Sequence, residues 1–254
     1  MRPKRYLTQL AVATAVAAGL ALALQGVVLA AVTYSSGTVG NDISYPNCPN
    51  NFPTGSSFGI VGVTGGRAFT TNSCLRQEFA WASGLNGGSN PGAALYMNLN
   101  APVGPTARDG LTGPLGSCSH KDKACIAYNY GYNAASAAYK YAVKEGATSS
   151  SWWLDIETSN SWSPKPYLNK KTISGAVDFF SQKKLAIGFY STPSQWASIT
   201  GSSIWHPSGS YPIWQAGASS KKSAESICSG VGFAGASPEL VQYVSDNFDT
   251  DYAC

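Results

Sequence analysis

The stretch that decides the fold reads WWLDIE and occupies positions 152–157. Its apolar part is too short for a helix and is flanked by serine and threonine. Short, nearly continuous apolar runs between polar turn residues are typical of strands that are buried on both faces. The same kind of run recurs five times along the chain: FGIVGVT (58–64), AALYMNL (93–99), LAIGFY (185–190), YPIWQ (211–215) and LVQYV (240–244).

Helical patterns lie between several of these runs. Apolar residues recur at helical spacing over 74–84, 133–145 and 172–183, and Gly146 suits the end of the second helix. Buried strands that alternate with helices indicate a parallel sheet covered on its outer face. At this length the usual closed form is the α/β barrel. Little helical patterning follows Tyr190, so we predict an irregular (β/α) TIM-like barrel with fewer helices than strands.

The start of the chain has the features of an export signal. Three of the 17 basic residues lie within the first five positions, and the chain then carries no charge as far as Asn41. A short basic region followed by an apolar region, here 7–29, and small residues is typical of a secretory signal peptide. We therefore predict a leader over 1–30 and one secreted domain over 31–254. The apolar region could also span a bilayer, so an N-terminal anchor is the alternative.

The charge balance of the remaining chain excludes one class of partner. Without the three leader cations, 14 basic residues face 13 acidic ones, against a formal net charge of +4 for the whole chain. Nucleic-acid binding requires a dense basic face, which this balance does not supply. No second apolar run is long enough to span a membrane. We therefore expect a monomer without nucleic-acid partners and, after leader removal, without membrane association.

Six cysteines lie beyond the leader, an even number that predicts three disulfides in an exported chain. Six cysteines permit about 15 pairings. Because short loops cost the least entropy to close, we predict pairing between neighbours. The predicted pairs are Cys48 with Cys74, Cys118 with Cys125, and Cys228 with Cys254.

Two other classes of chemistry lack the residues they need. A cysteine nucleophile requires a base, and the only histidines, His120 and His206, lie in polar, loop-like segments. The cysteines show no C-x₂-C spacing for a metal site. A serine protease or esterase would need a triad, and the same two histidines are the only candidates for its base.

Four acidic residues are candidates for the site of such a barrel. Asp155 and Glu157 end WWLDIE, Asp42 lies in NDISYPN (41–47), and Asp249 comes just after the last predicted strand. Side chains alternate along a strand, so Asp155 and Glu157 share one face. Barrel sites lie at the carboxyl ends of strands. We predict that the carboxylates converge on one cavity beside Trp153, whose ring would flank a sugar or desolvate an acid.

Paired carboxylates suit the hydrolysis of glycosidic bonds. One protonated group supplies a proton to the leaving oxygen, while an ionised group stabilises the positive sugar carbon or activates water. Neighbouring negative charges raise one pKa and so allow one pair to hold both roles. In the alternative, purely structural reading, one member of the pair forms a salt bridge with a nearby Arg or Lys and the other is solvated.

The order of these motifs resembles the family 25 glycoside hydrolases, the N-acetylmuramidase type of bacterial lysozyme. The resemblance runs from Asp42 to Asp251 and is carried by NDISYPN (41–47), FGIVGVTGG (58–66), AALYMNLN (93–100), WWLDIETS (152–159), AIGFYSTPSQW (186–196), YPIWQAG (211–217) and VQYVSDNFDTD (241–251). It implies a flattened α/β barrel that cleaves peptidoglycan between N-acetylmuramic acid and N-acetylglucosamine. It implies neither a cofactor nor a metal.

The resemblance also assigns roles. Glu157 matches the general acid, and Asp155 matches the carboxylate that assists at the anomeric centre or orients the acetamido group. Asp42 and Asp249 match aspartates that line an acidic groove. The candidates for substrate binding are Tyr190, which matches a sugar-contacting aromatic, Gln242, which matches the glutamine of a Trp-Gln-Tyr strand, and the strand residues Tyr96 and Trp153.

The chain departs from the family pattern at several positions. Val241 replaces an aromatic residue, Asp251 stands where asparagine is frequent, and 63–66 reads VTGG where a charged residue and Thr-Glu-Gly are usual. The cysteines and the segment between Cys118 and Cys125 are additional. These departures leave two alternatives open: a barrel that cleaves another glycan, and a glycan-binding protein of the cell wall without catalysis.

Overall fold

The computed structural model of the chain describes residues 33–49, 51–85 and 92–254. The predicted leader over 1–30 lies outside these residues, as does the alternative of an anchor. Among the helices of the described ranges, none combines the length and the apolar character needed to cross a membrane.

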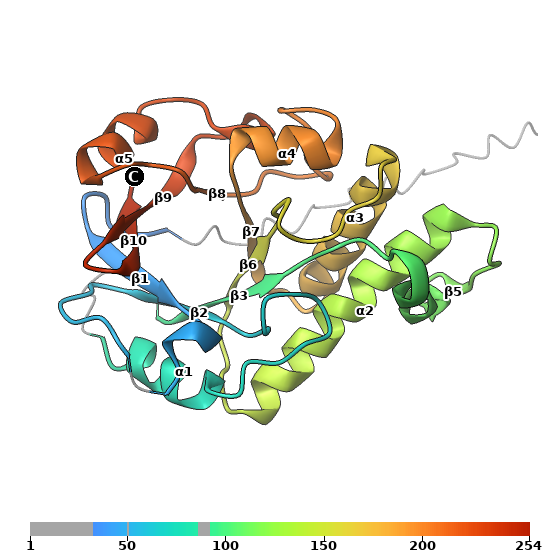
Figure 1. The fold of residues 1–254 in the computed structure, drawn as a ribbon, viewed down its shortest axis with the longest axis horizontal. Coiled ribbons are helices and arrows are strands. Elements are labelled where there is room, and N and C mark those ends of the chain that lie inside the picture. Colours follow the sequence, from blue (N-terminus) through green and yellow to red (C-terminus); the bar gives the residue numbers. More distant parts are fainter. Residues whose placement is uncertain (1–32, 50, 86–91) are drawn as a thin grey trace, which may run out of the picture.

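The described residues form a closed barrel of eight strands with helices packed around its outside (Figure 1). In chain order the barrel strands are β1 (Val39–Ile43), β2 (Gly59–Gly62), β3 (Ala94–Asn98), β6 (Ser151–Asp155), β7 (Ala186–Ser191), β8 (Ile213–Gln215), β9 (Pro238–Ser245) and β10 (Phe248–Ala253). Around the barrel their order is β1-β10-β9-β8-β7-β6-β3-β2. Neighbours are parallel except where β10 pairs with β1 and β9.

Helices connect successive strands over most of the barrel. They are α1 (Leu75–Ser83), α2 (Lys123–Lys144), α3 (Pro166–Gln182), α4 (Pro193–Thr200) and α5 (Lys221–Cys228), with short 3₁₀ turns at Tyr45–Asn47, Gly104–Gly110 and Phe233–Gly235. After α2 the chain turns through Gly146 at φ +79°, a left-handed conformation that glycine adopts without strain. The α/β barrel with fewer α-helices than strands is the predicted fold class, which the structure confirms.

Each strand and helix predicted from the sequence is present, but several elements were not predicted. The apolar runs correspond to β2, β3, β6, β7, β8 and β9, and the helical patterns correspond to α1, α2 and α3. α2 begins at Lys123, well before the predicted start near residue 133. The short helices α4 and α5 lie in the part where little helical patterning was found, and β1 and β10 contain polar residues that interrupt an apolar run.

The expectation of a parallel sheet is wrong at β10, which runs antiparallel to both of its neighbours. The chain reverses after β9 through Asp246 and Asn247, whose φ angles are +52° and +66°. Two consecutive residues with positive φ are typical of a two-residue type I′ hairpin turn, which aspartate and asparagine tolerate. Asp249 therefore lies inside β10, and not after the last strand as predicted.

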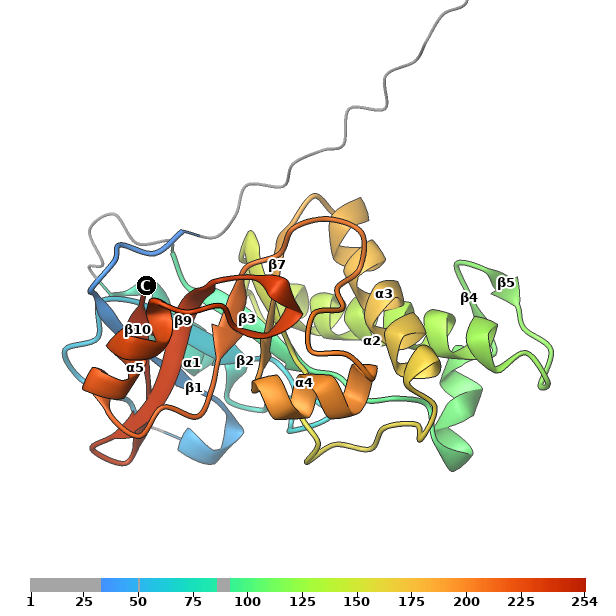
Figure 2. The ribbon, with the colours of Figure 1, turned by 90° about the horizontal axis from the view of Figure 1, so that it is seen from above.

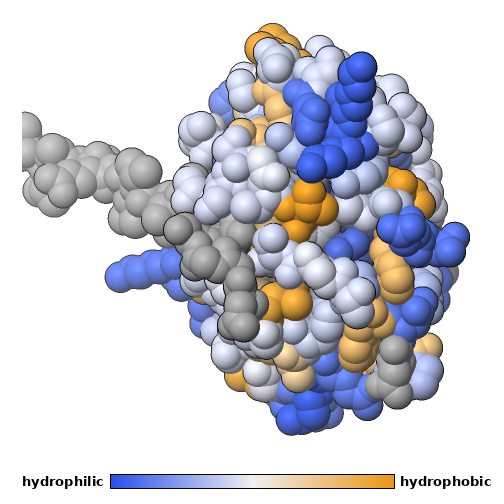
Figure 3. Space-filling view, turned by 90° about the vertical axis from the view of Figure 1, so that its left-hand side faces the viewer, coloured by the Kyte–Doolittle hydropathy of each residue, from blue (hydrophilic) through white to orange (hydrophobic). Residues whose placement is uncertain are grey.

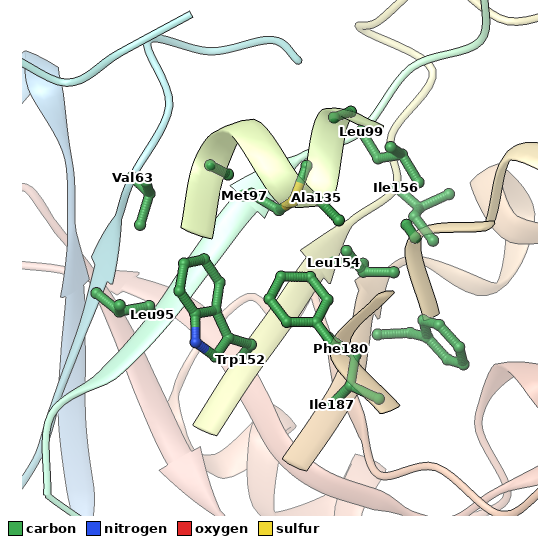
Figure 4. Packing of buried hydrophobic residues seen from close by; sticks show 14 of the residues in the cluster. Val63, Leu95, Met97, Leu99, Ala135, Trp152, Leu154, Ile156, Phe180 and Ile187 are labelled. Carbon is green, nitrogen blue, oxygen red and sulfur yellow. The ribbon is translucent and has the colours of Figure 1, made fainter. Parts of the chain in front are cut away.

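The apolar core has two layers because strand side chains alternate between the faces of the sheet. The outer layer lies between the barrel and the helices, where Trp152 and Phe180 pack with ring centroids 4.8 Å apart, close to Leu154 and Ile156 (Figure 4). The inner layer fills the barrel. It contains Tyr34, Phe58, Ile60, Ala94, Trp153, Trp214, Leu240 and Ala253.

Glycines allow close approach both inside and outside the barrel. A Cβ atom on Gly188 would collide with the ring of Trp153, so the inner layer depends on that glycine. On the outside, α2 and α3 pack side by side (Figure 2), with Gly131 against the backbone of Thr172 and Gly175 against the backbone of Tyr128. Backbone contacts of this kind leave no room for larger side chains.

Three disulfides join the six cysteines in the pairs predicted from the sequence, Cys48–Cys74, Cys118–Cys125 and Cys228–Cys254. The second closes the segment between the hairpin β4 (Thr112–Gly113) and β5 (Gly116–Ser117) and the start of α2. This hairpin lies at the end of the molecule away from the barrel (Figures 1 and 2). The third ties the end of α5 to the residue after β10.

The surface seen in Figure 3 carries apolar residues as separate spots among polar ones. The large apolar side chains that are exposed in the described residues come from many different elements and loops: Tyr45, Phe69, Leu115, Val143, Tyr167, Ile204, Val231 and Val244. Scattered exposure of this kind is normal for a globular protein.

Candidate active site

A pocket of about 370 Å³ lies at the carboxyl ends of the parallel strands. Four carboxylates line it: Asp42, Asp155, Glu157 and Asp249. We call it the acid pocket. Its other walls are neutral, and they are Ser44, Tyr45, Pro46, Gly66, Tyr96, Asn98, Ser159, Asn160, Tyr190, Trp214 and Gln242. The four acids that the sequence singled out thus lie in one pocket, as do three of the four candidates for substrate binding.

The exception is Trp153, and the predicted sugar contact of its ring is wrong. Trp153 is 0% exposed and belongs to the inner core layer beneath the pocket. Trp153 lies on the same face of β6 as Asp155, as predicted. It comes two residues earlier in the strand, however, and therefore lies deeper inside the barrel. Trp214 is the tryptophan that reaches the pocket, and its ring packs against Trp153 with centroids 5.8 Å apart.

Asp42 is held by a chain of hydrogen bonds from residues on β9 and β7. Gln242 Nε2 donates to Asp42 Oδ2 at 2.7 Å, and Tyr190 Oη donates to Gln242 Oε1 at 2.8 Å. The hydroxyl at the carbonyl oxygen fixes the amide of Gln242 so that its NH₂ group faces the acid. Two residues predicted to contact substrate therefore also orient Asp42.

Asp155 has a comparable partner in Asn98, whose Nδ2 donates to Asp155 Oδ2. Thr64 Oγ1 accepts from the backbone N–H of Asn98 at 3.0 Å and donates to Asn98 Oδ1 at 2.7 Å. This pair of hydrogen bonds fixes the amide of Asn98 with its NH₂ group toward the acid. All three residues are buried.

Glu157 follows β6 and is held through both its main chain and its side chain. Gln195 Nε2 lies 3.3 Å from Glu157 Oε1, and Trp162 Nε1 donates to the carbonyl oxygen of Glu157 at 2.7 Å. Neither partner was singled out from the sequence. Amides that hold acids leave no local pattern in a sequence, because the partners come from different strands and helices.

Among the residues that the structure describes, no lysine, arginine or histidine lines the acid pocket. The ion pairs of the described residues, Arg76 with Glu145 and Arg108 with Asp109, involve none of its acids. The alternative in which a cation neutralises one of the Asp155–Glu157 pair is therefore wrong for the described chain. Asp42, Asp155 and Glu157 have neutral amide donors instead, which stabilise a carboxylate less than a cation does.

Burial raises the pKa of three of these carboxyls, those of Asp42, Asp155 and Asp249. Burial first, and then the negative charge of Asp249, raise the pKa of Asp42 to about 8, while the hydrogen bond from Gln242 partly opposes the shift. Burial followed by the charges of Glu157 and Asp42 raises the pKa of Asp155 well above its ordinary value. The pocket is therefore built to keep some of its carboxyls protonated near neutral pH.

Asp249 and Asp251 lie at different depths on β10. Partial burial raises the pKa of Asp249, although this residue remains exposed at the mouth of the pocket. Asp251 is fully buried, accepts a hydrogen bond from Trp214 Nε1 at 2.8 Å, and has its pKa raised chiefly by burial. Asp251 thus holds the indole that forms part of the pocket wall.

A second cavity of similar volume, about 390 Å³, lies near the starts of β8 and β9. His206, Tyr211 and Glu239 are among its lining residues, but only one carboxylate faces it. Paired acids of the kind needed for proton transfer to a glycosidic oxygen occur in the acid pocket instead.

Comparison with known proteins gives a partial match in sequence. The family model described as lysozyme-like protein 1 matches residues 123–228. This segment extends from the start of α2 to the end of α5 and includes Asp155, Glu157 and Tyr190. No curated protein matches the chain.

Two solved structures are similar over most of the chain, at low identity. The catalytic domain of endolysin ply40, from a bacteriophage of Listeria monocytogenes, is 16% identical with a TM-score of 0.48, and the match covers 85% of this chain and 93% of that one. The modular Cpl-1 endolysin, in complex with a peptidoglycan analogue, is 12% identical with a TM-score of 0.49, covering 86% of this chain and 54% of that one. These likenesses are too distant to bear on function. In sequence, the chain resembles the lysozyme-like family over residues 123–228, the segment that carries Asp155, Glu157 and Tyr190.

Proposed function

We propose that this chain is a glycoside hydrolase that cleaves the glycan strands of peptidoglycan between N-acetylmuramic acid and N-acetylglucosamine. The observation that carries the proposal is the acid pocket, in which four carboxylates converge without a cation. Hydrolysis of a glycosidic bond needs one protonated and one ionised carboxyl. The lysozyme-like match over 123–228 supports the same reaction class.

In this proposal Glu157 is the general acid. Its proton passes to the glycosidic oxygen as the bond to the anomeric carbon breaks, and the electron pair of that bond stays with the leaving oxygen. Asp155 assists the positive anomeric carbon or orients the acetamido group of the substrate. Asp42 and Asp249 line the groove, while Tyr190, Tyr96 and Gln242 bind sugar.

Export is part of the proposal, since peptidoglycan lies outside the cytoplasmic membrane. The leader over 1–30 directs the chain outward and is removed, leaving a barrel domain over 31–254. Three disulfides agree with an oxidising compartment.

The test uses residues 31–254, purified with the disulfides formed, on suspended bacterial walls. We expect clearing of the suspension and release of reducing ends. Reduction of the products with borohydride identifies the sugar at each new end, which is muramic acid if the proposed bond is cleaved. Glu157→Gln should abolish release. Glu225→Gln is the matched control, because Glu225 is exposed on α5 outside the acid pocket.

The outcomes separate the alternatives. Release of a different reducing sugar from another polysaccharide would indicate a barrel with a different glycan substrate. Binding to walls without any release of reducing ends would indicate a glycan-binding protein. Full activity of Glu157→Gln would show that the acid is wrongly assigned.

A further inference from the structure

We propose that Gln195 is a positioning residue that determines which oxygen of the Glu157 carboxyl carries the proton. The inference rests on the proposed function, because it concerns the acid of that reaction. Gln195 lies in the first turn of α4, where its backbone N–H donates to Thr192 Oγ1 at 3.2 Å. Its side chain points from the helix to the segment that follows β6.

The orientation of the Gln195 amide is fixed by Thr158. Gln195 Oε1 accepts from the backbone N–H of Thr158 at 2.6 Å and from Thr158 Oγ1 at 2.9 Å. A backbone N–H can only donate, so the atom that faces it must be the carbonyl oxygen. The NH₂ group of the same amide is therefore directed to Glu157 Oε1, at 3.3 Å.

Both partners of this contact are anchored independently. Trp196, the next residue on α4, is fully buried, and its Nε1 donates to the carbonyl oxygen of Trp205 at 2.9 Å. On the other side, Trp162 holds the carbonyl oxygen of Glu157. The 3.3 Å separation is long for a hydrogen bond, as is common at catalytic groups before substrate is bound.

A donor at Oε1 has a direct chemical consequence. When Glu157 is protonated, its carbonyl oxygen is a better acceptor than its hydroxyl oxygen, so the NH₂ group at Oε1 favours the form in which the proton lies on Oε2. When the Oε2–H bond breaks and the proton moves to the glycosidic oxygen, Gln195 still donates to Oε1, and now to a carboxylate. A hydrogen bond to an ionised acceptor is the stronger one, so the contact favours proton delivery. Without it, the proton occupies either oxygen and the carboxyl rotates.

The test replaces Gln195 by methionine, which has similar length but neither donor nor acceptor. Two substrates are compared. The first is a glycan oligosaccharide without peptides, whose sugar leaving group must be protonated. The second is an aryl glycoside whose leaving group, dinitrophenolate, departs as an anion and needs no acid. We expect kcat for the oligosaccharide to fall about tenfold or more with KM unchanged, since positioned acids contribute roughly 10²–10⁴-fold. We expect kcat for the aryl glycoside to stay the same.

The matched control is Gln182→Met on α3. Gln182 also accepts a hydrogen bond, from Tyr132 Oη at 2.7 Å, but lies away from the acid pocket. It should leave both rates unchanged. Thermal unfolding of each variant shows whether it is folded, and Gln195→Ala serves as a second variant if methionine disturbs α4.

Two results would overturn the inference. An equal loss on both substrates would mean that Gln195 has a structural role only, and no loss on the oligosaccharide would mean that the proton is placed without it. A wild-type protein that cleaves neither substrate would contradict the proposed function itself, and this inference with it.

Discussion

Asp42 and Asp249 lie directly opposite each other in the antiparallel pair formed by β1 and β10. Directly opposed residues of such a pair have Cβ atoms about 4.5–5.5 Å apart, so the two carboxyls are close enough for each charge to oppose the ionisation of the other. Their strands are the first and the last of the barrel, and the pairing of these two strands closes it. The electrostatics of the pocket therefore depend on the one pair of strands that is most distant in sequence.

The first prediction concerns pH and stability. The pKa of Asp42 is raised from 3.8 to about 8 in the folded chain. Between these values the folded state holds a proton that the unfolded state has lost, so the free energy of unfolding falls as pH rises through this window. The variant Asp42→Asn has no carboxyl at this position, so this contribution to the fall in its free energy of unfolding is absent. Its stability relative to wild type should increase from pH 4 to pH 8, as measured by chemical denaturation.

The control for this series is Asp246→Asn, in the exposed turn between β9 and β10. Its stability relative to wild type should change little with pH. A relative stability of Asp42→Asn that is equally independent of pH would contradict the assigned burial of this charge.

The second prediction concerns the orientation of Gln242. Tyr190→Phe removes the hydroxyl that donates to Gln242 Oε1 and frees the amide to turn away from Asp42. One hydrogen bond has a net value of about 1 kcal/mol, which corresponds to roughly a fivefold loss of kcat. Wall-clearing rates would measure it. Tyr167→Phe, at an exposed position on α3, should have no effect, and equal rates for both variants would argue against the chain of hydrogen bonds.

The third prediction concerns the helix pair. A methyl group on Gly175 would collide with the backbone carbonyl of Tyr128, and backbone cannot move aside as a side chain can. Gly175→Ala should destabilise the fold by about 1–3 kcal/mol or more, because overpacking forces α2 and α3 apart. Gly92→Ala is the comparison, since nothing lies within contact distance of the added carbon there. Urea denaturation of both variants tests the difference, and equal midpoints would contradict it.

The fourth prediction concerns the disulfides. Cys228–Cys254 spans 26 residues and Cys118–Cys125 spans seven. In the chain-entropy description, removal of the disulfide that closes the longer loop lowers the free energy of unfolding by about 3.5 kcal/mol. Removal of the one that closes the shorter loop lowers it by about 2.4 kcal/mol. Paired serine substitutions should follow that order in denaturation midpoints. The reverse order would mean that the β4–β5 hairpin depends on Cys118–Cys125 more than β10 depends on Cys228–Cys254.

The sequence predicted those features that depend on local periodicity. The shared face of Asp155 and Glu157 follows from alternation along one strand, and the pocket contains both. The depth of a side chain within the barrel is not local, which is why the predicted contact of the Trp153 ring with a sugar is wrong. Depth depends on the stagger of neighbouring strands, and no single strand carries that information.

The amide partners and β10 were missed for related physical reasons. Asn98, Gln195 and Gln242 come from three different elements, and each is recognisable as a partner only when its acid lies beside it. Gln242 was found only through the family resemblance. β10 was missed because Asp249 and Asp251 interrupt its apolar pattern. These two acids occupy positions where a predicted buried strand would have apolar residues.

The antiparallel strand β10 has a consequence for the timing of synthesis. It supplies Asp249, covers the free edge of β1 and brings Gln242 on β9 to Asp42, 200 residues earlier in the chain. In a ribosome-bound chain that ends before Phe248, the edges of β1 and β9 are both open, and one of the four acids is missing. The acid pocket is therefore complete only once β10 has been made and has paired, so a partly synthesised or partly translocated chain holds an unfinished site.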